Sequence, residues 1–246
     1  MKKNVFLLFI LISMYVSGQN SEDEFLTTNL TERVLHIKNG ASTGSSYIIE
    51  KYDRSFLVTA KHIFPNLKEC DSITFQVNQD KQWKNISGIA HLHKNAEIDV
   101  IIIDLGVQLF GNNPNSYMRS GSVVFGDEGY FLGFPMGFQT DWLPGKNQGL
   151  PSALIKRATF SGQIEINGIL IPLLDGQNNP GFSGGPIFFK SYNKGIVKWS
   201  FFGIISGYYP QKNLLKTALG EFFYDENSGI IKCSSEIYIT EIMEKL

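Results

Sequence analysis

The chain has 246 residues, which is enough to bury a hydrophobic core in one large or two small domains. Its hydrophobic content of 43% and charged content of 18% are typical of a globular protein and exclude a disordered one. The formal net charge is −1 and Lys and Arg form no long run, so we expect no nucleic-acid partner. The 24 Gly, 19 Phe and 10 Tyr favour aromatic strands joined by tight turns.

The first residues have the pattern of an export signal. Lys2 and Lys3 precede an apolar run from Val5 to Val16, which is too short to span a bilayer comfortably. We predict a signal peptide over residues 1–18, cleaved after Gly18, and therefore a periplasmic or secreted protein without a stable membrane anchor after cleavage. An N-terminal anchor or a core segment is the alternative.

Short runs of β-forming residues, separated by turn signals, follow this segment. They are Tyr47–Glu50, Ser55–Thr59, Ile73–Val77, Ile86–His93, Val100–Leu105, Gly129–Phe134, Ala153–Phe160, Ile164–Leu174, Pro186–Phe189 and Val197–Ile205. Helical periodicity is weak until Glu236–Leu246, which predicts a short amphipathic helix. Leu214–Leu219 is a second helix candidate.

Many short strands and few helices predict an all-β protein built from antiparallel barrels or sandwiches. The loop Gly111–Ser122 is rich in turn formers and is the predicted linker between two β-domains. We therefore expect one domain over residues 19–118, and a second over 119–246 that includes the terminal helix.

The segment from Asn178 to Phe189 reads NNPGFSGGPIFF and places Ser183 among glycines, just before an apolar strand. It formally matches G-x-S-x-G, the nucleophile elbow of α/β-hydrolases, but that motif needs a following helix and a later histidine. Here a strand follows, and all four histidines precede the serine, which excludes this class. The order His, Asp, Ser remains open.

Two residues fill that order. His62 follows the apolar strand that ends in TAKH, and Asp99 stands directly before the apolar run Val100–Leu105. A serine hydroxyl becomes an effective nucleophile when a neighbouring base accepts its proton. His62 is the predicted base, and Asp99 is predicted to orient its imidazole. The backbone N–H groups of Gly181 and Ser183 are predicted to form the oxyanion hole.

TAKH, EIDV and DGQNNPGFSGGP resemble the three signature regions of trypsin-like (chymotrypsin-fold) serine proteases. TGSSYII before TAKH and GFP at 133–135 look more like the bacterial HtrA branch. The resemblance extends from about Leu35 to Gly207. It implies two perpendicular antiparallel six-stranded β-barrels, with the active site in the cleft between them. The implied activity is peptide-bond hydrolysis through an acyl-enzyme.

The same resemblance implies substrate-binding residues. Ser206 and Gly207 match the strand that borders the specificity pocket, where a polypeptide substrate would pair main chain to main chain. Gln177 stands six residues before the nucleophile, often the base of that pocket. Phe182 replaces the aspartate of pancreatic-type enzymes that captures a freed N-terminal ammonium, and Ile63 replaces a disulfide cysteine. We also expect no PDZ domain after the terminal helix.

The remaining candidate residues, for a metal site and for a disulfide, give weaker signals of function. His91 and His93 form an H-x-H pair without a third zinc ligand identifiable in the sequence, so we expect solvated strand residues and no metal or cofactor. Whether Cys70 and Cys233 form a disulfide stays open. Besides an exported serine endopeptidase, two alternatives remain: a protease-fold binding module without turnover, and an esterase that uses the same triad. The sequence does not predict the oligomeric state.

Overall fold

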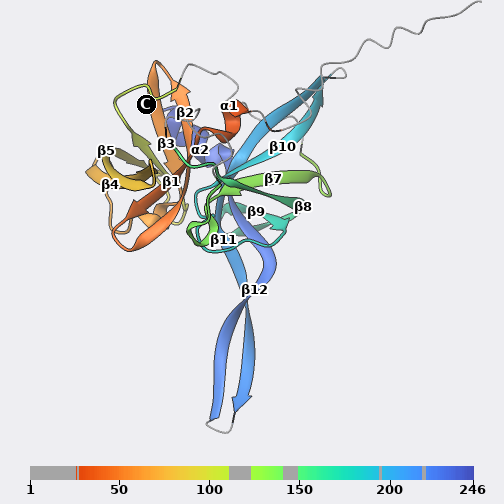
Figure 1. Ribbon diagram of the computed structural model, residues 1–246. Helices are drawn as coiled ribbons and strands as arrows, with labels where there is room; N and C mark the ends of the chain where they lie inside the picture. Colours follow the sequence, from red (N-terminus) through yellow and green to blue (C-terminus); the bar gives the residue numbers. More distant parts are fainter. Residues whose placement is uncertain (1–25, 27, 111–122, 141–148, 194–195, 218–219) are drawn as a thin grey trace, which may run out of the picture.

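The computed structural model describes residues 26, 28–110, 123–140, 149–193, 196–217 and 220–246. Its strands form two closed antiparallel barrels of six strands each, with the orders β1-β2-β3-β6-β5-β4 and β10-β11-β12-β9-β8-β7. The barrels lie side by side (Figure 1). The predicted fold class is confirmed.

The strands of the first barrel are β1 (Val34–Asn39), β2 (Ser42–Lys51), β3 (Arg54–Thr59), β4 (Ser72–Gln79), β5 (Gln82–Leu92) and β6 (Ile101–Asp104). Those of the second are β7 (Glu128–Gly133), β8 (Leu154–Ile166), β9 (Ile169–Asp175), β10 (Pro186–Asn193), β11 (Ile196–Thr217) and β12 (Gly220–Ser235). The helices are α1 (Thr28–Thr31) and α2 (Glu236–Met243), with 3-10 turns η2 (Lys61–Ile63) and η4 (Pro135–Gly137). No helix in the described part of the chain is long and apolar enough to cross a membrane.

The apolar runs of the first barrel are continuous because their strands are buried on both faces. Successive side chains of a strand point to opposite faces. Ile48 and Leu57 therefore fill the first barrel, whereas their neighbours Tyr47 and Val58 pack in a core shared with the second barrel. Tyr47 is fully buried there and stacks on Phe201 with ring centroids 5.3 Å apart.

Helix α2 closes this shared core, which confirms the predicted terminal helix. Ser235 caps its start by accepting a hydrogen bond from the N–H of Ile237, and Ile239 and Ile242 are buried in the shared core. Lys51 Nζ of β2 donates to the Met243 carbonyl, 2.7 Å away. The helix thus packs on both barrels. The predicted linker 111–122 and the signal segment 1–18 lie outside the described residues, so the domain boundaries stay predictions.

The helix predicted at Leu214–Leu219 is wrong, because the described part of this segment belongs to β11. Beyond the barrel, β11 and β12 continue as a two-stranded hairpin from Pro210↔Asn227 to Thr217↔Gly220, which we call the arm. The arm projects away from both barrels (Figure 1). Its apolar residues face each other across the two strands, Leu214 opposite Phe223. Cross-strand packing of this kind stabilises a ribbon in place of a helix.

The root of the arm is bonded to the segment that precedes Ser183. The Gly176 N–H donates to the Gly229 carbonyl over 2.9 Å. The Asn227 amide donates to the carbonyl of Asn178, which is 2% exposed. The strand pairing of β12 thereby fixes the path of the chain toward the candidate nucleophile.

Candidate active site

The register of the first barrel brings His62 and Asp99 to the same end of two neighbouring strands. Thr59, the last residue of β3, is paired with Ile101, the first residue of β6. In an antiparallel pair, the chain leaves one strand where it enters the other. His62 lies in η2, directly after β3, and Asp99 lies just before β6.

The carboxylate of Asp99 holds His62 at two points. Its Oδ1 accepts from the backbone N–H of His62 over 2.9 Å, and its Oδ2 lies 2.8 Å from the ring Nδ1. The side chains are 49% and 26% exposed. In the neutral tautomer with its proton on Nδ1, the imidazole presents an unprotonated Nε2 on its other side. A general base requires this orientation.

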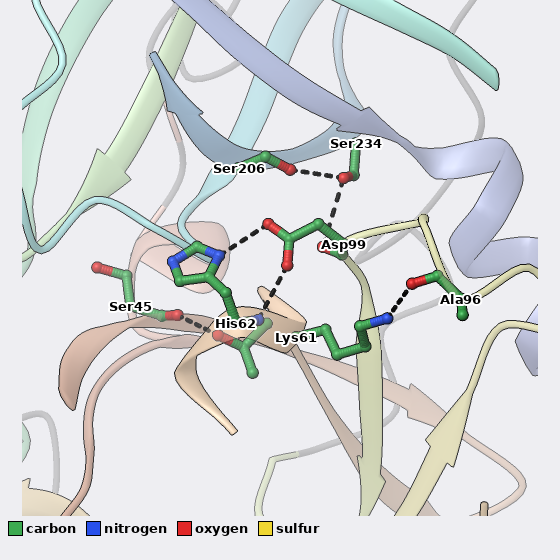
Figure 2. A network of polar contacts seen from close by, with 8 residues as sticks. Ser45, Lys61, His62, Ala96, Asp99, Ser206 and Ser234 are labelled. Carbon is green, nitrogen blue, oxygen red and sulfur yellow. Dashed lines mark hydrogen bonds and ion pairs between the residues drawn. The ribbon is translucent and has the colours of Figure 1, made fainter. Parts of the chain in front are cut away.

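Hydrogen bonds around Asp99 fix the loop that carries it. Ser234 Oγ lies 3.4 Å from the Asp99 carbonyl, to which it donates, and 2.7 Å from Ser206 Oγ. Lys61 Nζ donates to the carbonyl of Ala96 in the same loop. Figure 2 shows this network and the second ring nitrogen of His62 pointing away from Asp99.

The turn that carries Ser183 is packed against the end of β3 that leads to His62. The Ser183 carbonyl accepts from the Ser45 N–H over 2.8 Å, and the Gly184 N–H donates to the Ile205 carbonyl over 2.8 Å. Gly184 has a φ of +80°, and a Cβ there would clash with Thr59 Oγ1 and Ser45 O. Only glycine permits this approach between the two barrels.

The serine and the histidine are not hydrogen-bonded to each other. Among the described residues, neither Ser183 Oγ nor His62 Nε2 makes a hydrogen bond. Catalytic hydrogen bonds are often long in unliganded proteases and tighten when substrate binds. The geometry therefore unites His62 with Asp99 and places the serine turn beside the strand end that precedes them.

The peptide between Pro180 and Gly181 is held by a hydrogen bond to Met136. The Pro180 carbonyl accepts from the Met136 N–H over 2.7 Å, and no cis peptide bond is present among the described residues. In a trans peptide the carbonyl and the N–H point in opposite directions. The Gly181 N–H, at a φ of +105°, therefore points away from Met136. Within the described chain, neither it nor the Ser183 N–H donates a hydrogen bond.

Ser45, which sequence reasoning missed, joins this turn to both barrels. Its buried hydroxyl donates to the Gly181 carbonyl over 2.7 Å and accepts from the Phe134 N–H over 3.0 Å. Its carbonyl accepts from Thr59 Oγ1 over 2.7 Å. The TGSS stretch before TAKH contains this residue, so the resemblance located the segment but not the contact.

Phe182 anchors the turn by apolar packing. It is fully buried in the second barrel and meets Phe131 edge to face, with ring centroids 4.8 Å apart. A Cβ on Gly133 would clash with its ring, 2.7 Å away. At the position where the resemblance leads one to expect a buried aspartate, the chain uses a buried aromatic ring.

A cleft of about 370 Å³ lies beside His62 and Asp99. Ser206 lines it, whereas Gln177 does not and is exposed. Most of its other lining residues are apolar, from the loop before Asp99, β8, β9, β12 and α2, and include Ile98, Ile166, Ile169, Leu170, Ile171 and Tyr238. The charged side chains of Glu97 and Lys232 also line it.

The edge of β11 facing away from β12 is open along the predicted substrate strand. Strand β10 pairs with β11 as far as Ile204, and Ile205 bonds to Gly184 and Gly185 just before β10. Gly207 pairs with Lys232 of β12 on the other side. Ser206 lies at an irregularity between Ile205 and Gly207. An unpaired strand edge can accept an extended peptide.

Lys156 of β8 is a second residue that sequence reasoning missed. Its ammonium donates to the Gln177 carbonyl and to Asn179 Oδ1, the latter over 3.3 Å, and lies 5.8 Å from the Phe182 ring centroid. Burial lowers the pKa of Lys156. No local motif marks a strand lysine as a support for a distant loop, so no sequence signal identified it.

His36 is a buried, neutral histidine that packs on Phe134, the residue whose N–H bonds to Ser45. Its ring is stacked on Phe134 with centroids 4.7 Å apart, the residue is 4% exposed, and neither ring nitrogen has a hydrogen-bond partner among the described residues. Burial lowers the pKa of His36 to about 4. Since the folded state holds fewer protons than the unfolded state between this value and the usual 6.5, stability rises with pH across that window.

We expect the wild type to lose up to about 3 kcal/mol of unfolding free energy as pH falls from about 6.5 to about 4 through this group. His36→Phe keeps the stacking and should remove that part of the loss. Urea unfolding of both proteins across this range measures the difference. Parallel stability curves would contradict the assignment.

The structure corrects the expectation for His93 and answers the open question about the two cysteines. His93 is not a solvated strand residue: it follows β5, is 8% exposed and lies 2.7 Å from Glu241 of α2. His91 is on β5, half-buried, and lies 3.1 Å from Glu69. Cys70 is exposed and Cys233 is buried, and both are free. Burial raises the pKa of Cys233.

Comparisons with known proteins support the architecture. No family model and no curated protein matches the chain. Among solved structures, the HtrA-type protease AlgW with a tripeptide has a TM-score of 0.54 at 18% identity, covering 87% of this chain and 60% of that one. The serine endoprotease from Yersinia pestis has a TM-score of 0.51 at 18% identity, covering 87% and 62%.

Rv3671c from M. tuberculosis H37Rv, an inactive Ser-to-Ala mutant, has a TM-score of 0.52 at 15% identity and covers 88% of this chain and 87% of that one. The chain thus spans less than two thirds of AlgW and of the Yersinia enzyme. With two closed six-stranded barrels and these neighbours, the chain has the trypsin-like (chymotrypsin) serine protease fold.

Proposed function

We propose that the chain is an exported serine endopeptidase that cleaves polypeptides through His62, Asp99 and Ser183. The observation that carries the proposal is the two-point bond between Asp99 and His62, which leaves Nε2 open. Two further features support it. The backbone N–H groups of Gly181 and Ser183 donate no hydrogen bond within the described chain, and the edge of β11 at Ser206 and Gly207 is open. Export rests on the predicted signal peptide over residues 1–18.

In the proposed reaction, Ser183 Oγ attacks the scissile carbonyl carbon while His62 Nε2 takes its proton. The new C–O bond leaves an oxyanion, which accepts hydrogen bonds from the N–H groups of Gly181 and Ser183. His62 then gives the proton to the leaving amine, the C–N bond breaks and an acyl-enzyme remains. Water then attacks the ester carbonyl while His62 takes its proton; the bond to Ser183 Oγ breaks, His62 returns the proton to that oxygen, and the carboxylic acid product leaves.

The substrate is proposed to lie as an added strand on β11 at Ser206 and Gly207. Main-chain pairing there would place its neighbouring side chains in the cleft beside Asp99. The apolar lining of that cleft favours apolar side chains. The exposed position of Gln177 gives no support for a pocket base there, so we do not assign it a role in selectivity.

Labelling with a fluorophosphonate probe tests the proposal. The mature chain, from Gln19 onward, should be labelled, and Ser183→Ala and His62→Ala should not. Ser161→Ala, which removes an exposed hydroxyl of β8, is the matched control and should label like the wild type. Labelling that persists in Ser183→Ala would overturn the assignment of the nucleophile.

Labelling and cleavage assays on the wild-type protein distinguish the endopeptidase from two alternative functions. A binding module is favoured by the missing hydrogen bond between Ser183 and His62. It predicts a folded wild type that binds peptide but is never labelled. An esterase would be labelled and would cleave activated esters, but would release nothing from a library of peptide amides. The endopeptidase predicts both labelling and peptide cleavage.

A further inference from the structure

A cluster of three chemically different side chains lies outside the active site, where the chain enters β4. Glu69 and Cys70 precede β4, and His91 lies near the end of β5. Ser72 pairs with Ile89, and two further hydrogen bonds of 2.9 Å, from Cys70 N–H to Ala90 O and from Ala90 N–H to Asp71 O, extend this ladder. Because Cys70 and Asp71 both bond to Ala90, they form a β-bulge at this end of the ladder, which brings Glu69 and Cys70 beside His91.

The three side chains lie close enough together to share one metal ion. Glu69 Oε1 lies 3.1 Å from His91 Nδ1 and 3.7 Å from Cys70 Sγ, and all three atoms lie within 4.8 Å of one another. Zinc bonds of about 2.3 Å to sulfur and about 2.0–2.2 Å to nitrogen and oxygen, at tetrahedral angles, separate ligand atoms by roughly 3.3–3.6 Å. The two measured edges are within a few tenths of an ångström of these values, and the third, from Cys70 Sγ to His91 Nδ1, would have to shorten into the same range on binding.

The backbone already holds these side chains in place. The second oxygen of Glu69 accepts from the Leu92 N–H over 2.6 Å. Its first oxygen bonds to His91, so both oxygens of the carboxylate are held in place. Cys70 adopts a φ of +62°, a left-handed conformation that is uncommon for a non-glycine residue. The His91 side chain is only 12% exposed, which limits its rotamers.

The donor set selects among metals. A thiolate and an imidazole are preferred by zinc, whereas calcium and magnesium prefer sites made of oxygen alone. One carboxylate oxygen is compatible with zinc, and a water would complete four-fold coordination. Binding would release the proton of the Cys70 thiol.

We propose that Glu69, Cys70 and His91 form a zinc-binding site that ties the segment after His62 to β5. This segment runs from η2 to β4, and Leu92 beside the site pairs with Ile101, two residues after Asp99. A bound ion would therefore brace the two chain segments that carry the His62–Asp99 pair. Its role is structural, because it lies apart from the reacting atoms of the proposed triad.

Metal titration of the reduced, chelator-treated mature chain tests this site. Zinc should bind with a stoichiometry of one, measured by competition with a chromophoric chelator, and should raise the melting temperature. Cobalt in its place should give the strong visible absorption of a tetrahedral site and a thiolate charge-transfer band. Cys70→Ser and His91→Gln should each abolish the band, and Glu69→Gln should weaken affinity by at least about tenfold.

Glu165→Gln, which alters an exposed glutamate of β8, is the matched control and should bind zinc like the wild type. Circular dichroism of each variant without metal shows whether it is folded. The proposal is overturned if the wild type binds no zinc, if the cobalt complex lacks the thiolate band, or if folded Cys70→Ser and His91→Gln bind as tightly as the wild type. Fluorophosphonate labelling should persist in chelator, which separates this site from the proposed catalytic one.

Discussion

Asp99→Asn is expected to lower kcat for peptide cleavage by about 10⁴-fold while leaving KM nearly unchanged. The variant keeps the size of the side chain, but its amide can donate to Nδ1 and so favours the tautomer with the proton on Nε2. That proton occupies the position from which His62 should accept the serine proton. Asp99 bonds to the ring and the backbone of His62 and not to substrate, so the loss should appear in kcat.

Steady-state kinetics on a cleavable peptide, with fluorophosphonate labelling rates as a second readout, measure this effect. Asp225→Asn is the matched control, because Asp225 is an exposed aspartate of the arm, in β12, and does not bond to His62. Its kcat should stay within a few-fold of the wild type. A loss below tenfold in Asp99→Asn would show that the carboxylate does not orient the base.

Gly184→Ala is expected to destabilise the protein by about 2–5 kcal/mol and to abolish labelling. A left-handed conformation costs about 1–2 kcal/mol for a residue with a Cβ. Forcing that Cβ against Thr59 and Ser45 adds an overpacking cost of about 1–3 kcal/mol. The Cβ would also lie 2.9 Å from the Ala60 backbone nitrogen, which cannot move without shifting η2 and His62.

Gly168→Ala separates the cost of the left-handed conformation from the cost of overpacking. Gly168 has a φ of +77° in the turn between β8 and β9, and a Cβ there meets nothing within 4 Å. This variant should cost only the conformational term, about 1–2 kcal/mol, and should keep full labelling. Urea unfolding of both variants gives the comparison. Equal losses would show that the serine turn is not tightly packed against the first barrel.

The fold class could be predicted because its signals are local. Alternating or continuous apolar runs between turn residues marked most of the strands, and the terminal helix had its own periodicity. The run Ile164–Leu174 was read as one strand, but a turn at Asn167 and Gly168 divides it between β8 and β9. Strands β1 and β12 were not among the predicted runs, because their sequences mix charges and glycine with the apolar residues that the barrels bury.

The arm shows why local pattern was insufficient in one segment. Leu214 and Leu215 have the spacing of a helix face when read alone, and only their pairing with Phe223 and Phe222 makes them a strand. The partner strand is non-local information that the helix prediction did not use.

The candidate site was predictable to the extent that its residues lie in motifs. His62 and Asp99 were named from their flanks and lie within hydrogen-bond distance of each other. Ser45 and Lys156 support the serine turn through contacts between segments far apart in the sequence, which no spacing rule predicts. The cluster of Glu69, Cys70 and His91 was missed for the same reason, since two of its members lie across a strand pair from the third.

The hydrogen bonds of Ser45 also bear on the order in which the protein acquires its structure. Its hydroxyl joins Gly181 across 136 residues of chain, and Phe134 across 89. Contacts of such long sequence separation form late in folding, because the chain must lose loop entropy before they can form. Each barrel can close from its own hairpins, whereas the serine turn needs both barrels already docked. We therefore expect the serine turn to reach its position last, so partly folded chains would lack an assembled candidate site.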